Sequence, residues 1–148
     1  MKQLEVYSPR VLLFISAVLI SVGALFIFNQ KKGTGMIETG SGLRYEVLTD
    51  SDGKQPTAGR PVTVHYTGWL NDNDQPGTKF DSSVDRGEKF QFVLGIGMVI
   101  RGWDEMVSIM KVGQKVRAYL PAKLAYGEHG AGNIIKPNSD LIFDIELF

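Results

Sequence analysis

The sequence predicts an α+β fold: a strongly bent antiparallel five-stranded sheet wrapped around one short helix, preceded by one transmembrane helix. Three observations support this fold class. Five segments alternate apolar and polar residues with a period of two, as strands with one buried face do. One segment has apolar residues at helical spacing. Residues 11–28, VLLFISAVLISVGALFIF, contain no charge.

The uncharged segment 11–28 is near the lower length limit for a helix that crosses a hydrocarbon core of ~30 Å. A cleaved signal peptide, cut after Ala24, is the alternative, but its apolar region is usually ~7–15 residues long. We therefore expect residues 11–28 to be a transmembrane signal-anchor helix, with residues 1–10 as its N-terminal flank. Because long domains cross membranes largely regardless of flanking charge, we place the domain on the outer, periplasmic or extracytoplasmic, face.

Residues 29–41, NQKKGTGMIETGS, are polar and contain glycine, which predicts a flexible tether. The folded domain then occupies residues 42–148, a length that supports a single hydrophobic core. The turn-rich segments DSDGKQPTAG, NDNDQPG and VDRGE separate its strands. The predicted strands span residues 43–47, 62–66, 90–94, 116–120 and 141–147.

The helical segment follows the glycines of GIGMVIRGW and has apolar residues at i, i+3, i+4 and i+7. Asp104 and Glu105 stand in its first turn, where the helix dipole favours negative charge. Gly113 is positioned to cap its C-terminus. A single short helix among five strands can bury its apolar face if the sheet wraps around it. The apolar positions are Trp103, Met106, Val107 and Met110.

Composition and motifs exclude several classes of function. The 16 basic and 16 acidic residues balance, so there is no electrostatic reason to expect a nucleic-acid partner. The chain has no cysteine, which excludes disulfides, thiol nucleophiles and zinc–thiolate sites, and we expect neither a metal nor another cofactor. Gly95 and Gly97 do not form a phosphate loop, because position 100 is Ile100 and no Gly-Lys-Ser/Thr follows. His65 lies in a predicted strand, which favours a structural role over that of a catalytic base.

Apolar residues in predicted loops indicate a pocket. Phe80 is followed at once by Asp81 in a turn-rich segment. Tyr126 and the pair Ile134 and Ile135 lie in another loop, AYGEHGAGNIIKP. Large apolar side chains are otherwise scarce in such segments, so their presence favours a lined, partly open pocket over plain core packing.

Five motifs extend this interpretation: VHYTGWL, TKFDSSVDRG, FVLGIGMVIRGWDEMV, MKVGQKVRAYLPAKLAYG and NSDLIFDIEL. In their order and spacing they closely resemble the FKBP-type peptidyl-prolyl cis-trans isomerases, over residues 64–148 and with GLRYEVL as the preceding strand. The resemblance implies a bent antiparallel sheet around a short helix, with an aromatic active-site pocket between the two. The N-terminal segment and the tether lie outside the resemblance.

The resemblance also implies roles for individual residues. The indole of Trp103 is expected to be the pocket floor on which a proline ring rests, with Gly102 letting the chain turn tightly beneath the cavity. The Ile100 backbone N–H is expected to face the ligand, and the Tyr126 hydroxyl to bind a substrate carbonyl. The implied catalytic residues are Asp81, Tyr126, Trp103 and Phe143. The implied substrate-binding residues are Tyr66, Phe80, Arg86, Phe90, Val99, Ile100, Trp103 and Ile135.

The implied activity is isomerisation of Xaa-Pro bonds during the folding of exported or membrane proteins. The rotation barrier of ~18–20 kcal/mol comes from amide resonance, so a dry aromatic pocket has only to favour the twisted amide over the planar one. Asp81 then either lies near the twisted carbonyl or braces Arg86 and Tyr126, and the sequence leaves both roles open. The alternatives are a binding module or chaperone for proline-containing or apolar segments with little turnover, and a purely structural membrane-tethered domain.

The expected partners are Xaa-Pro segments of protein substrates, with macrolide inhibitors of the rapamycin type as candidate small ligands and the membrane held through residues 11–28. Because the cavity is apolar, we expect Leu or Phe before proline to be preferred over Asp or Glu. Four rim positions depart from the better-known family members and bear on sequence preference and macrolide affinity. These positions are Met98, Ala131, Gly132 and Lys136.

Overall fold

The computed structural model describes residues 35–148. The predicted flank 1–10, the predicted anchor 11–28 and the first part of the predicted tether lie outside the described residues. Across residues 35–148, no helix combines the length and the apolar character that crossing a membrane requires.

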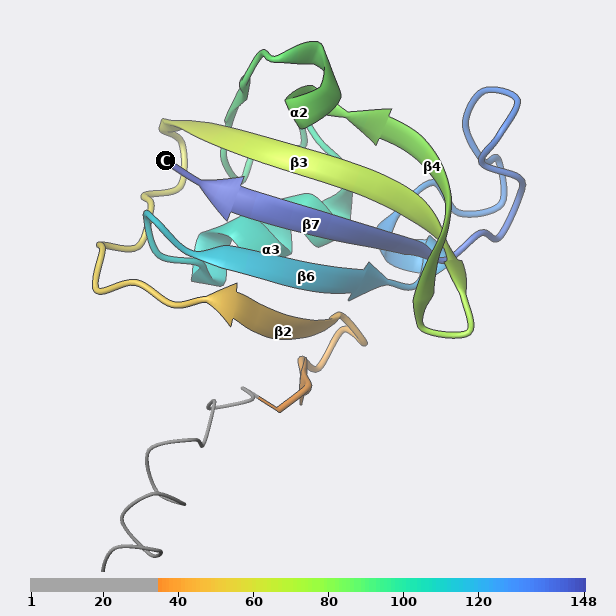
Figure 1. Cartoon of the computed structure of the whole chain (residues 1–148), viewed down its shortest axis with the longest axis horizontal. Coiled ribbons are helices and arrows are strands. Elements are labelled where there is room, and N and C mark those ends of the chain that lie inside the picture. The colour runs from red at the N-terminus through yellow and green to blue at the C-terminus, as the bar shows by residue number, and fades with distance from the viewer. Residues whose placement is uncertain (1–34) are drawn as a thin grey trace, which may run out of the picture. The chain divides into compact units, whose positions relative to one another are not determined.

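One antiparallel sheet dominates the described part of the chain, and α3 (Arg101–Ile109) lies behind β6 and β7 in Figure 1. The strand order is β1-β2-β6-β7-β3-β4, and β5 also pairs with β3. The predicted architecture, an antiparallel sheet with a short helix against it, is therefore confirmed. The strands are β1 (Ile37–Glu38), β2 (Arg44–Thr49), β3 (Pro61–Asp72), β4 (Gln75–Ser82), β5 (Phe90–Val93), β6 (Lys115–Leu120) and β7 (Leu141–Leu147).

The sheet formed by residues 35–148 has seven strands, so the predicted count of five is wrong. The five predicted strands are present as β2, β3, β5, β6 and β7, whereas the sequence pattern misses β1 and β4. β4 lacks a regular apolar–polar alternation and begins inside NDNDQPG, which predicts a loop. Asn73 and Asp74 make the turn between β3 and β4, with φ values of 52° and 63°. Positive φ at both residues is the backbone that a tight two-residue hairpin requires.

The predicted tether 29–41 extends too far, because its last residues belong to the domain. Ile37 pairs with Tyr45 of β2 in the sheet. The Thr39 hydroxyl donates to the Glu105 carboxylate of α3 at 2.6 Å, and the Ser41 hydroxyl donates to the same carboxylate at 2.8 Å. The two hydroxyl contacts with Glu105 join residues more than 60 positions apart, so local composition cannot reveal them.

α3 confirms the predicted helix and buries Trp103 and Met106. It ends at Ile109, with Met110 as its C-cap rather than the predicted Gly113, whose φ of 89° instead serves the turn into β6. The expectation of one short helix is also incomplete. Two single turns accompany α3: the helix α2 (Ser83–Arg86) and the 3-10 helix η1 (Ala122–Leu124).

β3 pairs with three strands, and on one of its edges Tyr66 lies between two of them without a strand partner. β7 runs along one edge of β3. On the other edge, β5 pairs with residues 61–64 and β4 with residues 67–72. The fully buried Ser83 fills the gap between them, because its Oγ accepts from the Tyr66 N–H at 2.8 Å and donates to the Tyr66 carbonyl at 3.2 Å. A side chain thus replaces a strand where β4 and β5 part.

The hydrophobic core lies between α3 and the sheet. Trp103 belongs to the same cluster of buried side chains as the strand residues, so the floor of the pocket described below is continuous with the core. The strand residues of this cluster include Val64, Phe92, Val116, Ile145 and Leu147.

Candidate active site

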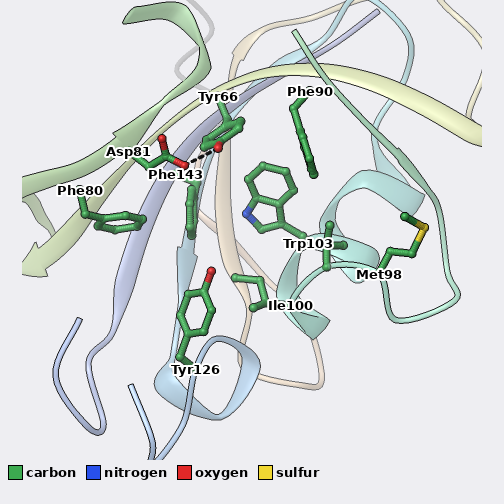
Figure 2. A pocket seen from close by; sticks show the side chains of 10 residues that line it. Tyr66, Phe80, Asp81, Phe90, Met98, Ile100, Trp103, Tyr126 and Phe143 are labelled. Atoms are coloured by element: carbon green, nitrogen blue, oxygen red, sulfur yellow. Dashed lines mark hydrogen bonds between the residues drawn. The ribbon is translucent and has the colours of Figure 1, made fainter. Parts of the chain in front are cut away.

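An aromatic pocket of about 440 Å³ lies beside α3, with side chains of the sheet strands around it (Figure 2). This volume is in the range of small-molecule sites, ~300–1,000 Å³. The lining comes from β3, β4, β5, β7, α3 and two loops, so distant parts of the sequence meet here. The lining residues are Tyr66, Phe80, Asp81, Phe90, Met98, Val99, Ile100, Trp103, Tyr126 and Phe143.

Trp103 forms the centre of the pocket. Its indole is 5% exposed and has its ring centroid 4.9 Å from that of Tyr66 and 5.4 Å from that of Phe143, both in edge-to-face contact. Its Nε1 is buried and has no hydrogen-bond partner among the described residues. Edge-to-face aromatic contacts add stability beyond the burial of area. The indole is therefore fixed in orientation by the rings around it.

Gly102 allows the helix that carries Trp103 to approach the sheet. A Cβ at this position would lie 2.4 Å from the Leu120 Cδ2 atom of β6. The backbone there is helical and has no positive φ. The expectation that Gly102 provides a tight turn is therefore wrong, and its function is close packing.

Gly68 in β3 has a comparable function on the opposite wall. A Cβ there would lie 2.6 Å from Phe80 Cζ and 2.7 Å from Phe143 Cε1. The absence of a side chain lets these two rings meet edge to face with centroids 5.6 Å apart. Sequence reasoning missed this residue, although a glycine inside a strand often marks a close approach of this kind.

The loop before α3 is held by Asp104. Its carboxylate accepts from the Gly95 N–H at 2.8 Å and from the Gly97 N–H at 3.0 Å. Both glycines have positive φ, 80° and 75°, which a glycine adopts without steric cost. The two glycines therefore serve to fold the loop back onto the helix, and this loop carries Met98 and Val99 into the pocket lining.

Three polar side chains form the rim. The Tyr66 hydroxyl donates to the Asp81 carboxylate, which is also paired with Arg86. Arg86 Nη2 donates to the Tyr66 hydroxyl at 3.1 Å, and its guanidinium lies over the Tyr66 ring at 5.8 Å. Asp81 therefore braces Tyr66 and Arg86. Of the two partners considered for this bracing, Arg86 is bonded, and Tyr66 takes the place expected for Tyr126.

The rim fixes the protonation states of the site. Partial burial alone would raise the pKa of Asp81, but the hydrogen bonds from Tyr66 and Arg86 outweigh it and lower the pKa below its ordinary value. Burial, and then the hydrogen bond to Asp81, raise the pKa of Tyr66. Burial, and then the Asp81 charge, raise the pKa of Tyr126, whose hydroxyl points into the pocket (Figure 2). The pocket therefore holds an ionised carboxylate and two protonated phenols.

Most of the expected site residues come together in this pocket, and two do not line it. Arg86 contacts the pocket through Asp81 and Tyr66 rather than as part of the lining. Ile135 is buried in the core, because its backbone bridges Ala131 with hydrogen bonds of 2.8 and 3.2 Å. Met98, assigned from the sequence to the rim alone, is part of the lining.

His65 does not line this pocket. His65 Nδ1 is 2.9 Å from the Ser83 hydroxyl, and the imidazole packs edge to face on Phe148. No group of three or more His, Asp or Glu side chains that could hold a metal ion occurs within residues 35–148.

Comparison with known proteins agrees with this geometry. The family described as FKBP-type peptidyl-prolyl cis-trans isomerase matches residues 52–148. An FK506-binding protein of Neisseria meningitidis serogroup C is 50% identical over 105 residues, which are 71% of this chain and 93% of the relative. The peptidyl-prolyl cis-trans isomerase Fkbp12 of Drosophila melanogaster is 48% identical over 107 residues, 72% of this chain and 95% of the relative. The crystal structure of AtFKBP13 superposes with a TM-score of 0.68 at 35% identity, covering 76% of this chain and 96% of that chain.

Proposed function

The chain belongs to the FKBP-type peptidyl-prolyl cis-trans isomerase family, and we propose that the pocket over Trp103 is where it isomerises Xaa-Pro bonds. The family activity is acceleration of the cis-trans exchange of these bonds. The observation that supports the proposal most strongly is the buried indole, surrounded edge to face by Tyr66, Phe90 and Phe143 at the base of an open cavity. A flat apolar ring of this kind suits the pyrrolidine ring of proline.

Such a pocket can catalyse the reaction without a nucleophile, a metal or a proton relay. The barrier of ~18–20 kcal/mol arises from amide resonance, and the rotation breaks no bond. Catalysis requires interactions that are stronger with the twisted amide than with the planar one. Aromatic walls exclude the water that solvates the planar, resonance-stabilised amide, and a fixed indole holds the ring while the preceding carbonyl rotates.

We assign different roles to the two polar groups nearest the cavity. Both carboxylate oxygens of Asp81 are used by Tyr66 and Arg86, so Asp81 acts as a positioning residue for the rim. The Tyr126 hydroxyl points into the cavity (Figure 2) and is kept protonated by its raised pKa. It is therefore the candidate donor to the substrate carbonyl.

A binding module or chaperone with little turnover is the second candidate, because the same pocket would hold proline in either case. The two are separated by measuring isomerisation and binding of the same peptides, Ala-Xaa-Pro-Phe with Xaa as Leu, Phe, Asp or Glu. We expect turnover with all four and a preference for Leu and Phe. Tight binding with no acceleration would support the module, and a preference for Asp or Glu would contradict the apolar pocket.

We propose that macrolides of the rapamycin type occupy the same pocket. The support is the lining and the similarity to proteins named FK506-binding. Titration with FK506 should inhibit isomerisation competitively with the peptide. Inhibition that does not compete with peptide, or no inhibition at saturating drug, would place macrolide binding elsewhere or exclude it.

The membrane anchor at residues 11–28, the outer location of the domain and its action on exported or membrane proteins are also proposals, supported by the uncharged run alone. Protease added to cells with a permeabilised outer envelope should release a fragment that begins within residues 29–36, since Ile37 is already part of the sheet. Cleavage that requires cell lysis would reverse the topology. A mature chain starting near Leu25 would instead indicate signal cleavage.

A further inference from the structure

Met98 is a methionine that both lines the pocket and remains open to solvent. Its side chain is 59% exposed although it belongs to the pocket lining. Met106 and Met110, by contrast, are fully buried. Figure 2 shows Met98 at one edge of the pocket, on the side of Trp103 and Ile100. An oxidant dissolved in water can therefore reach its sulfur without unfolding the protein.

We propose that Met98 is a site of reversible oxidation by peroxides, and that its sulfoxide weakens the binding of proline-containing chains. The inference rests on the proposed function of the pocket and adds a modification that regulates it. The chain contains no cysteine, so its sulfur atoms that peroxide could oxidise all belong to methionine.

The reaction balances with hydrogen peroxide as the oxidant. A lone pair of the Met98 sulfur attacks one peroxide oxygen, an S–O bond forms and the O–O bond breaks. The thioether is oxidised by two electrons to a sulfoxide, and the peroxide is reduced to water. Methionine sulfoxide reductases reverse the change with a thiol as reductant.

The sulfoxide should act on binding because of where the side chain is held. The Asp104 hydrogen bonds to Gly95 and Gly97 fix the loop, so the Met98 backbone cannot easily move away from the pocket. The neighbouring lining residues Val99 and Ile100 offer apolar side chains. A bound peptide that covers Met98 would bury the sulfoxide oxygen without a hydrogen-bond donor. Loss of solvation for one polar group weakens affinity on the order of tenfold.

Met36 provides a matched control. It is 47% exposed and so is also open to peroxide. It precedes β1, which lies at the opposite end of the strand order from β4, the strand of Phe80 and Asp81. Oxidation of Met36 should therefore leave the pocket unaffected.

The test uses the full chain treated with hydrogen peroxide, with oxygen incorporation at each methionine followed by peptide mass spectrometry. The Kd for a fluorescently labelled Ala-Leu-Pro-Phe peptide is measured before and after treatment in wild type, Met98→Leu and Met36→Leu. We expect treatment to raise the Kd about tenfold in wild type and Met36→Leu, to leave Met98→Leu at its own untreated value, and to be reversed by reductase.

Three results would overturn the proposal: Met98 staying unoxidised while Met36 reacts, an unchanged Kd when Met98 is fully oxidised, or an equal loss in Met98→Leu. Failure of the proposed function is read separately, from isomerase turnover of the untreated chain. If the untreated chain bound the peptide without turnover, the proposed activity would be wrong, but the effect of Met98 oxidation on binding could still be measured.

Discussion

The floor and the rim of the pocket are built from different interactions. The floor consists of Trp103 and Phe143, which are buried in the core and fixed by ring contacts. The rim consists of Tyr66, Asp81 and Arg86, which are partly exposed and held by charge and hydrogen bonds. Exposed ion pairs contribute little to stability, ~0–1 kcal/mol. Truncating a buried aromatic side chain to alanine, by contrast, costs about 3–5 kcal/mol. Substitutions in the floor should therefore affect folding and binding together, and substitutions in the rim should affect function nearly alone.

Trp103→Leu should have the largest effect. Leucine retains part of the volume but loses the flat ring, so we expect the free energy of unfolding to fall by about 2 kcal/mol. The loss of a buried aromatic anchor should reduce kcat/KM at least about tenfold. Denaturant unfolding and peptide isomerisation measure the two quantities.

The two measurements on Trp103→Leu also test the comparison itself. A protein that no longer folds would show that the indole serves mainly the core. Unchanged turnover in a folded protein would mean that the proline site lies elsewhere.

Gly68→Ala should come next, because its methyl group would overlap the rings of Phe80 and Phe143. Overpacking of a close contact typically costs about 1–3 kcal/mol, and the displaced rings should lower kcat/KM by less than Trp103→Leu does. Gly40→Ala is the matched control, since a Cβ there meets no atom within 4 Å. Equal stability of the two variants would show that the wall tolerates a shift of the rings.

Alternation identified the five segments in which two or more apolar side chains pack against the core, and it failed for β1 and β4, which contribute none and one. β1 is exposed at both residues, and β4 has exposed or half-buried side chains along nearly its whole length. Both strands are defined by backbone hydrogen bonds to a neighbouring strand, which do not depend on the type of side chain. The same reasoning explains the tether boundary, because the Glu105 contacts with Thr39 and Ser41 depend on the finished fold.

The lining of the site was predicted by family resemblance rather than by periodicity. Apolar residues in predicted loops indicated a pocket, but the sequence pattern could not show which of two adjacent residues points inward. Ile134 is exposed and Ile135 buried because the bridge to Ala131 turns one side chain inward. The positioning roles of Gly68 and Asp104 were missed since each acts on residues brought near by folding.

Asp81→Asn should separate the rim from the floor. The substitution removes the charge that pairs with Arg86 and weakens the orientation of Tyr66. We expect kcat/KM to fall about fivefold, the effect of one hydrogen bond of ~1 kcal/mol, while stability at neutral pH changes by less than about 1 kcal/mol. Asp85→Asn is the matched control, because Asp85 pairs with Lys79 and does not line the pocket. A large loss of stability in Asp81→Asn alone would place Asp81 with the structural residues of the floor.

The dependence of the free energy of unfolding on pH below neutrality provides a second test of Asp81→Asn. The folded-state pKa of Asp81 is lowered, so its contribution is present above the ordinary value of ~3.9 and is lost as the pH falls through the folded pKa. Asp81→Asn should lose stability less steeply than wild type below about pH 4. If the stability of Asp81→Asn and of wild type fell equally steeply with decreasing pH, the pair with Arg86 would add nothing to the stability of the folded state.

The smallest effect is expected from pH within the neutral range, where no group of the pocket titrates. Asp81 stays ionised because its pKa is lowered, and Tyr66 and Tyr126 stay protonated because their pKa values are raised above the ordinary ~10. His65 is bonded to Ser83, and like His129 it is absent from the lining. We therefore expect kcat/KM to vary less than about twofold between about pH 6 and 9, with a solvent deuterium effect near unity. Replacing both histidines by glutamine should preserve this profile, because the slow step is rotation of an amide held on the indole and moves no proton. A titration near pH 6.5 that either replacement abolishes would show that a histidine takes part and that the slow step involves a proton.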